Sequence, residues 1–190
     1  MANKVLFGFK NLYVGTYTVG TTGTVSLGTP YHQAGAVGFA ADPQGDNYTF
    51  YADDTAYYSS YASGVYEGDL TVAMFDDAFK TAYCGAITLN DGGIAEVKNA
   101  VRPAIYMMFE IDGDDAGRKV IFYNGTIGNI SREYSTIEEN VEVATESAPV
   151  RFVGDNKTGI TKVTYKKGDS GYASLFTNPP VPTLPTPVTT

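Results

Sequence analysis

The chain has 190 residues, a formal net charge of −8 and 43% hydrophobic residues, with 15 Tyr, 10 Phe, 21 Gly and no Trp. A chain of this length suits one domain that buries about 70% of its unfolded surface, and its aromatic and glycine content favours strands over helices. The acidic balance argues against a protein that binds nucleic acid, because phosphate contacts depend on clustered Lys and Arg. A single cysteine excludes an intrachain disulfide.

Charge is distributed unevenly along the chain. The segment Ala40–Asp115 holds 14 acidic and three basic residues, a net charge of −11, so the rest carries +3. Such asymmetry marks either a solvated acidic face or two surfaces that complement each other. No apolar run approaches the roughly 20 residues that span a bilayer, and Met1–Lys10 lacks the apolar core of a signal peptide. We therefore expect a protein made in a cytoplasm, without a membrane segment.

The first forty residues predict three strands. Lys10–Val19 alternates and is rich in Tyr, Val and Thr, which is typical of a strand. A shorter strand is predicted at Thr24–Leu27, between glycine-containing turns. Tyr31–Ala41 is small and apolar with Gly35 and Gly38 inside it, and a strand with such glycines bends sharply or approaches other backbone closely.

A tyrosine-rich segment, 42–64, has few aliphatic residues to attach it to a core. It contains β-forming residues for two strands, Asp46–Ala52 and Thr55–Ala62, joined at Asp53-Asp54. We predict that it forms a long loop or hairpin, called the arm below, that projects from the domain. Its tyrosines are Tyr48, Tyr51, Tyr57, Tyr58 and Tyr61.

The only predicted helix spans Asp76–Cys84. Asp76 or Asp77 can cap its start, since a carboxylate there accepts hydrogen bonds from free backbone N–H groups. Gly85 is placed to end it in a left-handed conformation. Its apolar face has helical spacing and consists of Phe75, Phe79, Ala82 and Tyr83.

Six further strands are predicted, and the chain ends in a proline-rich segment. Glu67 and Asp69 share one face of the first of these strands, Val65–Phe75. Residues 177–190 hold five of the nine prolines, so we predict an extended, flexible tail there. The six strands are Val65–Phe75, Pro103–Ile111 and Arg118–Tyr123 as a hairpin, Gly125–Ser135, Val141–Val153 and Ile160–Tyr165.

Nothing in the sequence predicts an enzyme, a metal site or a cofactor site. His32 is the only histidine, and without a Gly-x-Ser-x-Gly motif we predict a hydrogen-bonded structural role for it. Cys84 is expected to face the core and to be inert, and one His with one Cys cannot form a zinc site. Residues 112–115 lack the spacing of an EF-hand and are interpreted as a turn.

Several short segments recur in a characteristic order along the chain. They are Phe9–Tyr13, Tyr31–Val37, Phe50–Asp54, Gly68–Val72, Arg102-Pro103, Phe109–Gly125 and Ser131–Thr136. Their order resembles that of the major tail tube proteins of siphovirus-type bacteriophages of Gram-positive hosts. The similarity runs from about Val5 to Tyr165, which is nearly all of the predicted folded part.

The resemblance implies a mainly β fold in residues 1–176, a β-sandwich or small barrel with one flanking helix and the arm. It further implies hexameric rings that stack into the tube of a virion tail, through which DNA passes without specific binding. The implied partners are other copies of the chain and the tape measure, tail tip and tail terminator proteins. In that family the segment corresponding to the arm reaches toward the neighbouring ring.

Two sets of site residues follow as hypotheses. Tyrosines suit an interface because they offer a large contact area with a polar tip, and an acidic channel wall lets DNA slide because it repels phosphates. The expected contacts of the arm are Tyr48, Tyr51, Asp53, Asp54, Tyr57, Tyr58 and Tyr61. The expected acids of the channel are Glu67 and Asp69 first, then Glu110, Asp112, Asp114 and Asp115.

Two other functions remain open at this point. A monomeric β-sandwich that binds a carbohydrate or a receptor has a similar composition, with abundant Tyr, acidic charge and short strands. The second alternative is a tail terminator or an adaptor ring protein that shares its ancestry with tail tube proteins. Tubes or elongating hexamers separate the tail tube from both.

Overall fold

The structure is a computed structural model that describes residues 8–45, 47–61, 64–113, 116–134 and 144–184. Within these residues it is mainly β with one helix, α1 (Asp77–Tyr83), which confirms the predicted fold class. The strands are β1 (Phe9–Val19), β2 (Val25–Leu27), β3 (Tyr31–Gln33), β4 (Ala36–Phe39), β5 (Asp42–Gln44), β6 (Asn47–Ala52), β7 (Thr55–Tyr61), β8 (Val65–Val72), β9 (Ile87–Thr88), β10 (Ile94–Ala95), β11 (Ile105–Ile111), β12 (Lys119–Ile127), β13 (Ser131–Arg132), β14 (Glu146–Phe152) and β15 (Lys162–Tyr165).

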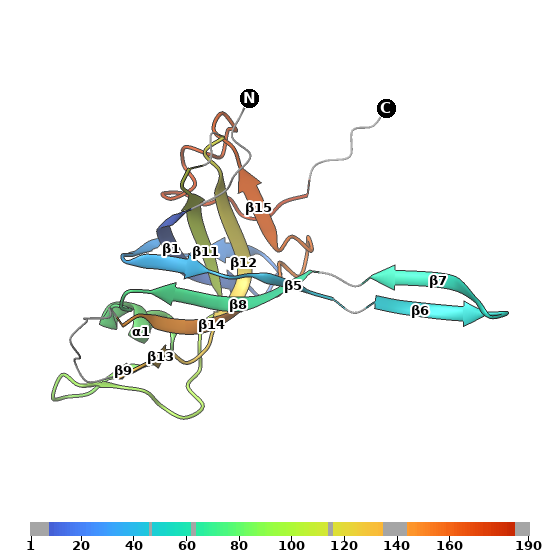
Figure 1. Ribbon diagram of the computed structural model, residues 1–190. Helices are drawn as coiled ribbons and strands as arrows, with labels where there is room; N and C mark the ends of the chain where they lie inside the picture. Colours follow the sequence, from blue (N-terminus) through green and yellow to red (C-terminus); the bar gives the residue numbers. More distant parts are fainter. Residues whose placement is uncertain (1–7, 46, 62–63, 114–115, 135–143, 185–190) are drawn as a thin grey trace, which may run out of the picture.

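Most strands belong to one antiparallel sheet that folds back on itself (Figure 1). Its order is β2-β1-β11-β12-β14-β8-β4, while β3 pairs with β1, β5 with β8, β13 with β14 and β15 with β12. Strands β1, β11, β12 and β15 form one layer, and β8 and β14 cross it as the second (Figure 1). The end strands β2 and β4 are not paired with each other among the described strands, so the fold is an open sandwich and not a closed barrel.

Strand β12 joins the two layers because it changes partners along its length. Residues 119–122 pair with β15, whereas residues 125–127 pair with β14. Between these stretches Asn124 adopts a left-handed conformation with φ of 52°. A Cβ on Gly125 would lie 2.3 Å from the ring of Phe152, so only glycine lets β14 approach this closely.

The main core lies between the two layers and under α1. Phe122 is at its centre, with ring centroids 5.0 Å from Phe152 and 5.6 Å from Phe39. Contacts of this kind bury large apolar area and add a favourable ring geometry. The buried members are Leu12, Val14, Leu70, Val72, Phe75, Phe79, Tyr83, Ile105, Met107, Val120, Phe122, Ile127, Ala148, Val150 and Phe152.

A second, smaller core lies on the other face of β1, β11 and β12, and the C-terminal segment covers it. Leu175 is fully buried there, and Phe176 stacks on Tyr13 with ring centroids 4.8 Å apart. Tyr123 donates a hydrogen bond to the carbonyl oxygen of Pro180 at 2.8 Å, and Pro182 is buried. The predicted mobile tail is therefore anchored to the domain as far as Pro182, and residues 185–190 lie outside the described residues.

Strand β1 carries a glycine that accommodates a tyrosine of the neighbouring strand β11. A Cβ on Gly15 would lie 2.3 to 2.5 Å from the ring and hydroxyl of Tyr106. Tyr106 is fully buried, and its hydroxyl donates to the carbonyl oxygen of Gly28 at 2.6 Å. The tyrosine thus satisfies its polar end while its ring occupies the space beside Gly15.

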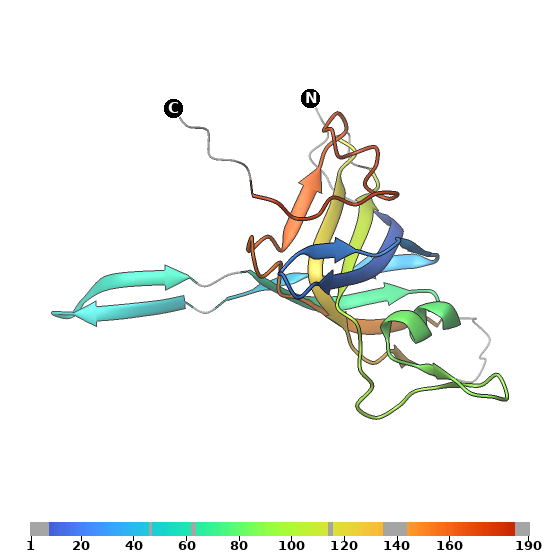
Figure 2. The same cartoon turned by 180° about the vertical axis from the view of Figure 1, so that it is seen from behind.

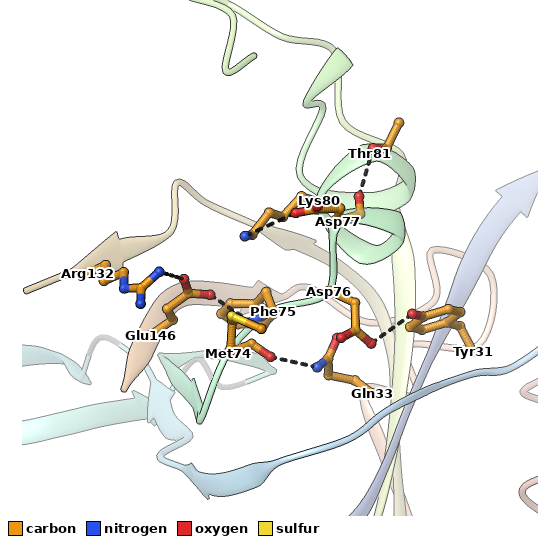
Figure 3. Close-up of polar contacts among 10 residues, drawn as sticks. All are labelled: Tyr31, Gln33, Met74, Phe75, Asp76, Asp77, Lys80, Thr81, Arg132 and Glu146. Atoms are coloured by element: carbon orange, nitrogen blue, oxygen red, sulfur yellow. Dashed lines mark hydrogen bonds and ion pairs between the residues drawn. The ribbon is translucent and has the colours of Figure 1, made fainter. Parts of the chain in front are cut away.

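Helix α1 is attached to the sheet by polar contacts as well as by its aromatic face (Figure 3). The buried Glu146 accepts a 2.6 Å hydrogen bond from the backbone N–H of Phe75 and an ion pair from Arg132. Asp76 occupies the N-cap position but makes no side-chain cap, because its carboxylate accepts from the hydroxyl of Tyr31 at 3.0 Å. The prediction that the Asp76 side chain caps the helix is therefore wrong, because its carboxylate binds the hydroxyl of Tyr31 instead.

The helix otherwise matches its prediction except at Ala82, which was placed on the apolar face but is exposed, and some strand bounds also differ. Phe79 and Tyr83 are buried, and Gly85 has the expected left-handed φ of 75°. The single strand predicted at Tyr31–Ala41 is divided into β3 and β4, because Gly35 also has a positive φ of 77°. The strand predicted at 65–75 ends at Val72, and the one predicted at 125–135 is divided between β12 and β13.

Candidate functional site

Residues 42–44 of the predicted arm form β5, which pairs with β8 in the body, so the projecting segment is shorter than predicted. What projects is the hairpin of β6 and β7, which forms a sheet of its own and is called the arm from here on. Figure 1 shows it projecting far beyond the layers of the body, and Figure 2 shows the same from behind. Tyr57 is 79% exposed and Tyr51 66%, and Tyr48, Tyr58 and Phe50 are also exposed. Phe50 was not predicted as a contact residue, although it belongs to the same exposed set.

Aromatic side chains lie on both faces of the hairpin. Phe50 pairs with Tyr58, and Tyr48 two residues before Phe50 lies on the same face. The register then shifts between Phe50 and Tyr51, so that Tyr51 pairs with Ala56 and Tyr57 is the extra residue of a bulge. Because adjacent residues of a strand point to opposite faces, Tyr51 faces away from Phe50. A hairpin with two aromatic faces is suited to contact surfaces on both sides.

Two acids form the tip of the arm, as predicted for Asp53-Asp54. Both have left-handed conformations, with φ of 51° and 56°. Two positive φ values in a two-residue loop define a type I′ turn, whose twist matches that of the flanking strands. The tip therefore presents two carboxylates at the point farthest from the body.

A buried polar group holds the base of the arm against the body. The hydroxyl of Thr161 donates to the carbonyl oxygen of Gly64 at 2.6 Å, just after β7. The loop before Thr161 is organised by Asp155, which is buried and accepts from Tyr17 and from the N–H and hydroxyl of Thr158, each at 2.6 Å. These residues were not identified from the sequence.

The ionisation of this pair follows from its contacts. Burial alone would raise the pKa of Asp155, but the hydrogen bonds from Thr158, Tyr17 and the backbone outweigh it, so the pKa lies below its usual value. Burial, and then the hydrogen bond to Asp155, raise the pKa of Tyr17. Asp155 is therefore a carboxylate and Tyr17 a neutral phenol at neutral pH.

The predicted channel acids lie in two places and are partly neutralised. Glu67 on β8 forms a 3.0 Å ion pair with Arg151, while the neighbouring Asp69 is exposed. Asp112, at the far end of β11, contacts Lys10 at 2.6 Å, and Glu110 accepts from Asn11. Asp114 and Asp115 lie outside the described residues, as does the side chain of Tyr61. The role of these acids in a channel stays a prediction.

An open hollow of about 580 Å³ lies on the outer face of β8 and β14. Its wall combines Glu67 and Asp69 with Arg151 and with Arg102 from the loop before β11. Arg102 is held in place because its Nε donates to the carbonyl oxygen of Cys84 at 2.9 Å. The hollow thus has mixed charge and is not a uniformly acidic surface.

Cys84 and His32 are the two other side chains that were considered for reactive chemistry. Burial raises the pKa of the Cys84 thiol to about 11, which makes a thiolate rare at neutral pH. His32 is exposed and its ring lies 4.8 Å from that of Tyr13. In the described parts of the chain, no three His, Cys, Asp or Glu side chains are placed to hold a metal ion. No described helix has the length and hydropathy to cross a bilayer.

Comparison with known proteins gives a likeness of fold. No family model matches the sequence, and no curated protein sequence matches it. The tube terminating cap of the anti-feeding prophage is similar with a TM-score of 0.52 and 10% identity, over 87% of this chain and 95% of that one. At this identity the likeness shows the fold, so the chain shares the architecture of a tube cap subunit.

Two further solved structures are similar at lower scores. Both come from the extended state of an extracellular contractile injection system, PVC. Its sheath-tube complex has a TM-score of 0.49 and 10% identity, over 86% of this chain and 93% of that one. Its sheath/tube terminator has a TM-score of 0.49 and 8% identity, over 86% and 99% of the two chains.

Proposed function

We propose that this protein is a structural subunit of a tail-like tube, in which copies close into rings and the arm contacts a neighbouring subunit. Six copies per ring and passage of DNA follow from the sequence resemblance to siphovirus-type tail tube proteins. The observation that carries the proposal is the arm, a separate hairpin with exposed aromatic residues on both faces. The tube cap fold of the body supports it.

The arm exposes apolar area that only an intermolecular contact would bury. Burying a large apolar side chain contributes about 1.5–3 kcal/mol, and the arm exposes Tyr48, Phe50, Tyr51, Tyr57 and Tyr58. A monomer gains nothing from this surface, and a two-stranded hairpin is only marginally stable by itself. Contacts on both faces in an assembled tube account for the composition and for the length of the segment.

Ring closure has a physical basis in the open sheet. Edge strands offer unpaired N–H and C=O groups to other chains, and a head-to-tail contact of this kind closes into a ring when the rotation permits. Among the described candidate channel acids, Asp69 and Glu110 remain, because Glu67 and Asp112 are compensated by Arg151 and Lys10.

A terminal ring is the second candidate function, and the likeness to a tube terminating cap favours it. A cap subunit needs the same ring contacts as a tube subunit but stops elongation at one face. The two functions therefore differ in whether rings of the purified protein stack.

Negative-stain microscopy and light scattering of the full chain test both functions. Tubes support the tube subunit, and rings that never elongate support the cap. A chain that stays monomeric at the highest concentration that can be reached, and shows no dimer after chemical crosslinking, contradicts both and favours a monomeric binding module.

An arm variant tests the observation that carries the proposal. Tyr51→Ser with Tyr58→Ser removes one aromatic side chain from each face of the hairpin, and assembly should be lost. Tyr134→Ser is the matched control, because Tyr134 is 85% exposed but lies on the body. Assembly that survives in the arm variant, or fails equally in the control, contradicts the role of the arm.

A further inference from the structure

The tip of the arm holds two carboxylates in a turn whose second position fits Gly better than Asp. Left-handed conformations cost an ordinary residue about 1–2 kcal/mol, although Asp tolerates them better than most. Asn-Gly is the pair that best fits a type I′ turn, yet this chain has Asp53 and Asp54, with φ of 51° and 56°. Local rules are broken mainly where function requires it. The two charges at the tip therefore indicate a contact that uses them.

The arm cannot neutralise these charges itself. Residues 47–61 contain no Lys or Arg, and Asp53 and Asp54 are their only acids. A six-residue strand is about 20 Å long at roughly 3.3 Å per residue, and the hairpin points away from the body (Figures 1 and 2). The cations that meet Asp53 and Asp54 must then belong to another molecule.

A run of exposed lysines lies on and around β15. Lys157, Lys162, Lys166 and Lys167, called the lysine edge below, are all exposed. No described carboxylate forms an ion pair with them, whereas four other basic residues of the surface are paired. The paired residues are Lys10 with Asp112, Lys80 with Asp77, Arg132 with Glu146 and Arg151 with Glu67.

The backbone of β15 is also available to a partner. Among the described strands, β15 pairs only with β12, so its other edge is free. Val163 and Tyr165 pack against the second core, and Lys162 and Thr164 alternate with them on the other side of β15. The Lys162 ammonium lies 5.1 Å from the ring centroid of Tyr66, so Lys166 and Lys167, which follow β15, are the lysines most accessible to a partner. Edge lysines repel a second edge of the same kind, and they attract an acidic hairpin. The lysine edge therefore selects against edge-to-edge aggregation and in favour of the tip.

We propose that the lysine edge receives the tip of the arm from a second copy of this chain, with Asp53 and Asp54 placed against Lys166 and Lys167. The inference rests on the proposed function, because it names the surface that the arm contacts in the assembly. Each copy offers one tip and one edge, so the contact is heterologous and passes from subunit to subunit. It joins an acidic tip in the segment with net charge −11, residues 40–115, to lysines of the remainder, which carries +3.

Charge reversal in the full chain tests this contact. Lys166→Glu should raise the concentration at which the protein assembles about tenfold, because like charges then meet at the interface. Lys98→Glu is the matched control, since Lys98 is an exposed loop lysine and the net charge changes equally. Adding Asp54→Lys to Lys166→Glu should restore assembly toward the wild-type threshold.

Zero-length crosslinking gives a second readout that does not depend on tubes. A carbodiimide joins a carboxylate to an amine in direct contact, and crosslinked dimers should contain Asp53 or Asp54 joined to Lys166 or Lys167. Two results would overturn this inference while leaving the proposed function intact. One is a Lys166→Glu variant that assembles at the same concentration as the wild type, and the other is crosslinks that join the tip to Lys98. A wild-type chain that neither assembles nor crosslinks contradicts the proposed function, and this contact with it.

Discussion

The body and the arm use similar aromatic residues in opposite ways. In the body, Phe39, Phe122 and Phe152 pack around one another with ring centroids 5.0 to 6.4 Å apart. In the arm, Phe50 and Tyr58 form a cross-strand pair that remains exposed. The body therefore derives its stability from its own interior, whereas the arm depends on surfaces outside the molecule. Four sets of substitutions test this difference between body and arm.

The largest difference is expected for phenylalanine truncation. Phe152→Ala should lower the free energy of unfolding by about 3–5 kcal/mol, because a buried aromatic ring is lost and a cavity remains. Phe50→Ala in the arm should change it by less than about 0.5 kcal/mol, as for most surface sites. Urea unfolding followed by circular dichroism measures both. Equal losses at the two sites would contradict the division between body and arm.

A buried carboxylate in the body should come next. Glu146→Ala leaves the N–H of Phe75 without its acceptor and should cost about 1–3 kcal/mol. Arg132→Ala removes only the partly exposed partner of Glu146, and such pairs contribute about 0–1 kcal/mol. The same urea experiment compares them. If the arginine variant loses more stability than the glutamate variant, the hydrogen bond to Phe75 is not what holds α1.

The base of the arm should respond to acid. The folded pKa of Asp155 lies below its unfolded value near 4, so its contribution is present above that value and is lost as pH falls through the folded pKa. Tyr17→Phe removes one hydrogen bond to this carboxylate and should cost about 1–2 kcal/mol at neutral pH. It should also flatten the fall in stability below about pH 4. Parallel acid profiles for variant and wild type would exclude this assignment.

The smallest effect is expected at the tip of the arm. Asp53→Asn with Asp54→Gly keeps the turn and should stabilise it by about 1 kcal/mol, since Gly accepts a positive φ without strain. Amide hydrogen exchange in β6 and β7 should then slow about fivefold, while the melting temperature of the body stays unchanged. Faster exchange in the hairpin would show that the carboxylates stabilise the turn.

Features that depend on local pattern were predictable from the sequence. The arm was recognised because 42–64 is rich in Tyr and poor in aliphatic residues, and its strands and turn are as expected. Phe79 and Tyr83 were placed on the buried face of α1 by their spacing alone. Such features need no knowledge of which distant segment lies nearby.

Features that depend on neighbours far along the chain were not predictable. The lysine edge lies at the edge of the sheet because β15 pairs only with β12 among the described strands. The sequence of β15 does not indicate that it is an edge strand. The buried Glu146 accepts a hydrogen bond from the backbone N–H of Phe75, which is 71 residues away in the sequence. The C-terminal prolines predict an extended chain, but they do not indicate that the carbonyl oxygen of Pro180 accepts a hydrogen bond from Tyr123.

The close packing of Tyr106 against Gly15 limits which substitutions these two positions can accept during evolution. A side chain at position 15 and the ring at position 106 would occupy the same space, so neither position can change freely without the other. Homologues that carry alanine or a larger residue at position 15 should carry a smaller residue at position 106. This pair should therefore stand out as co-varying in a deep alignment, even if both positions look variable when considered separately.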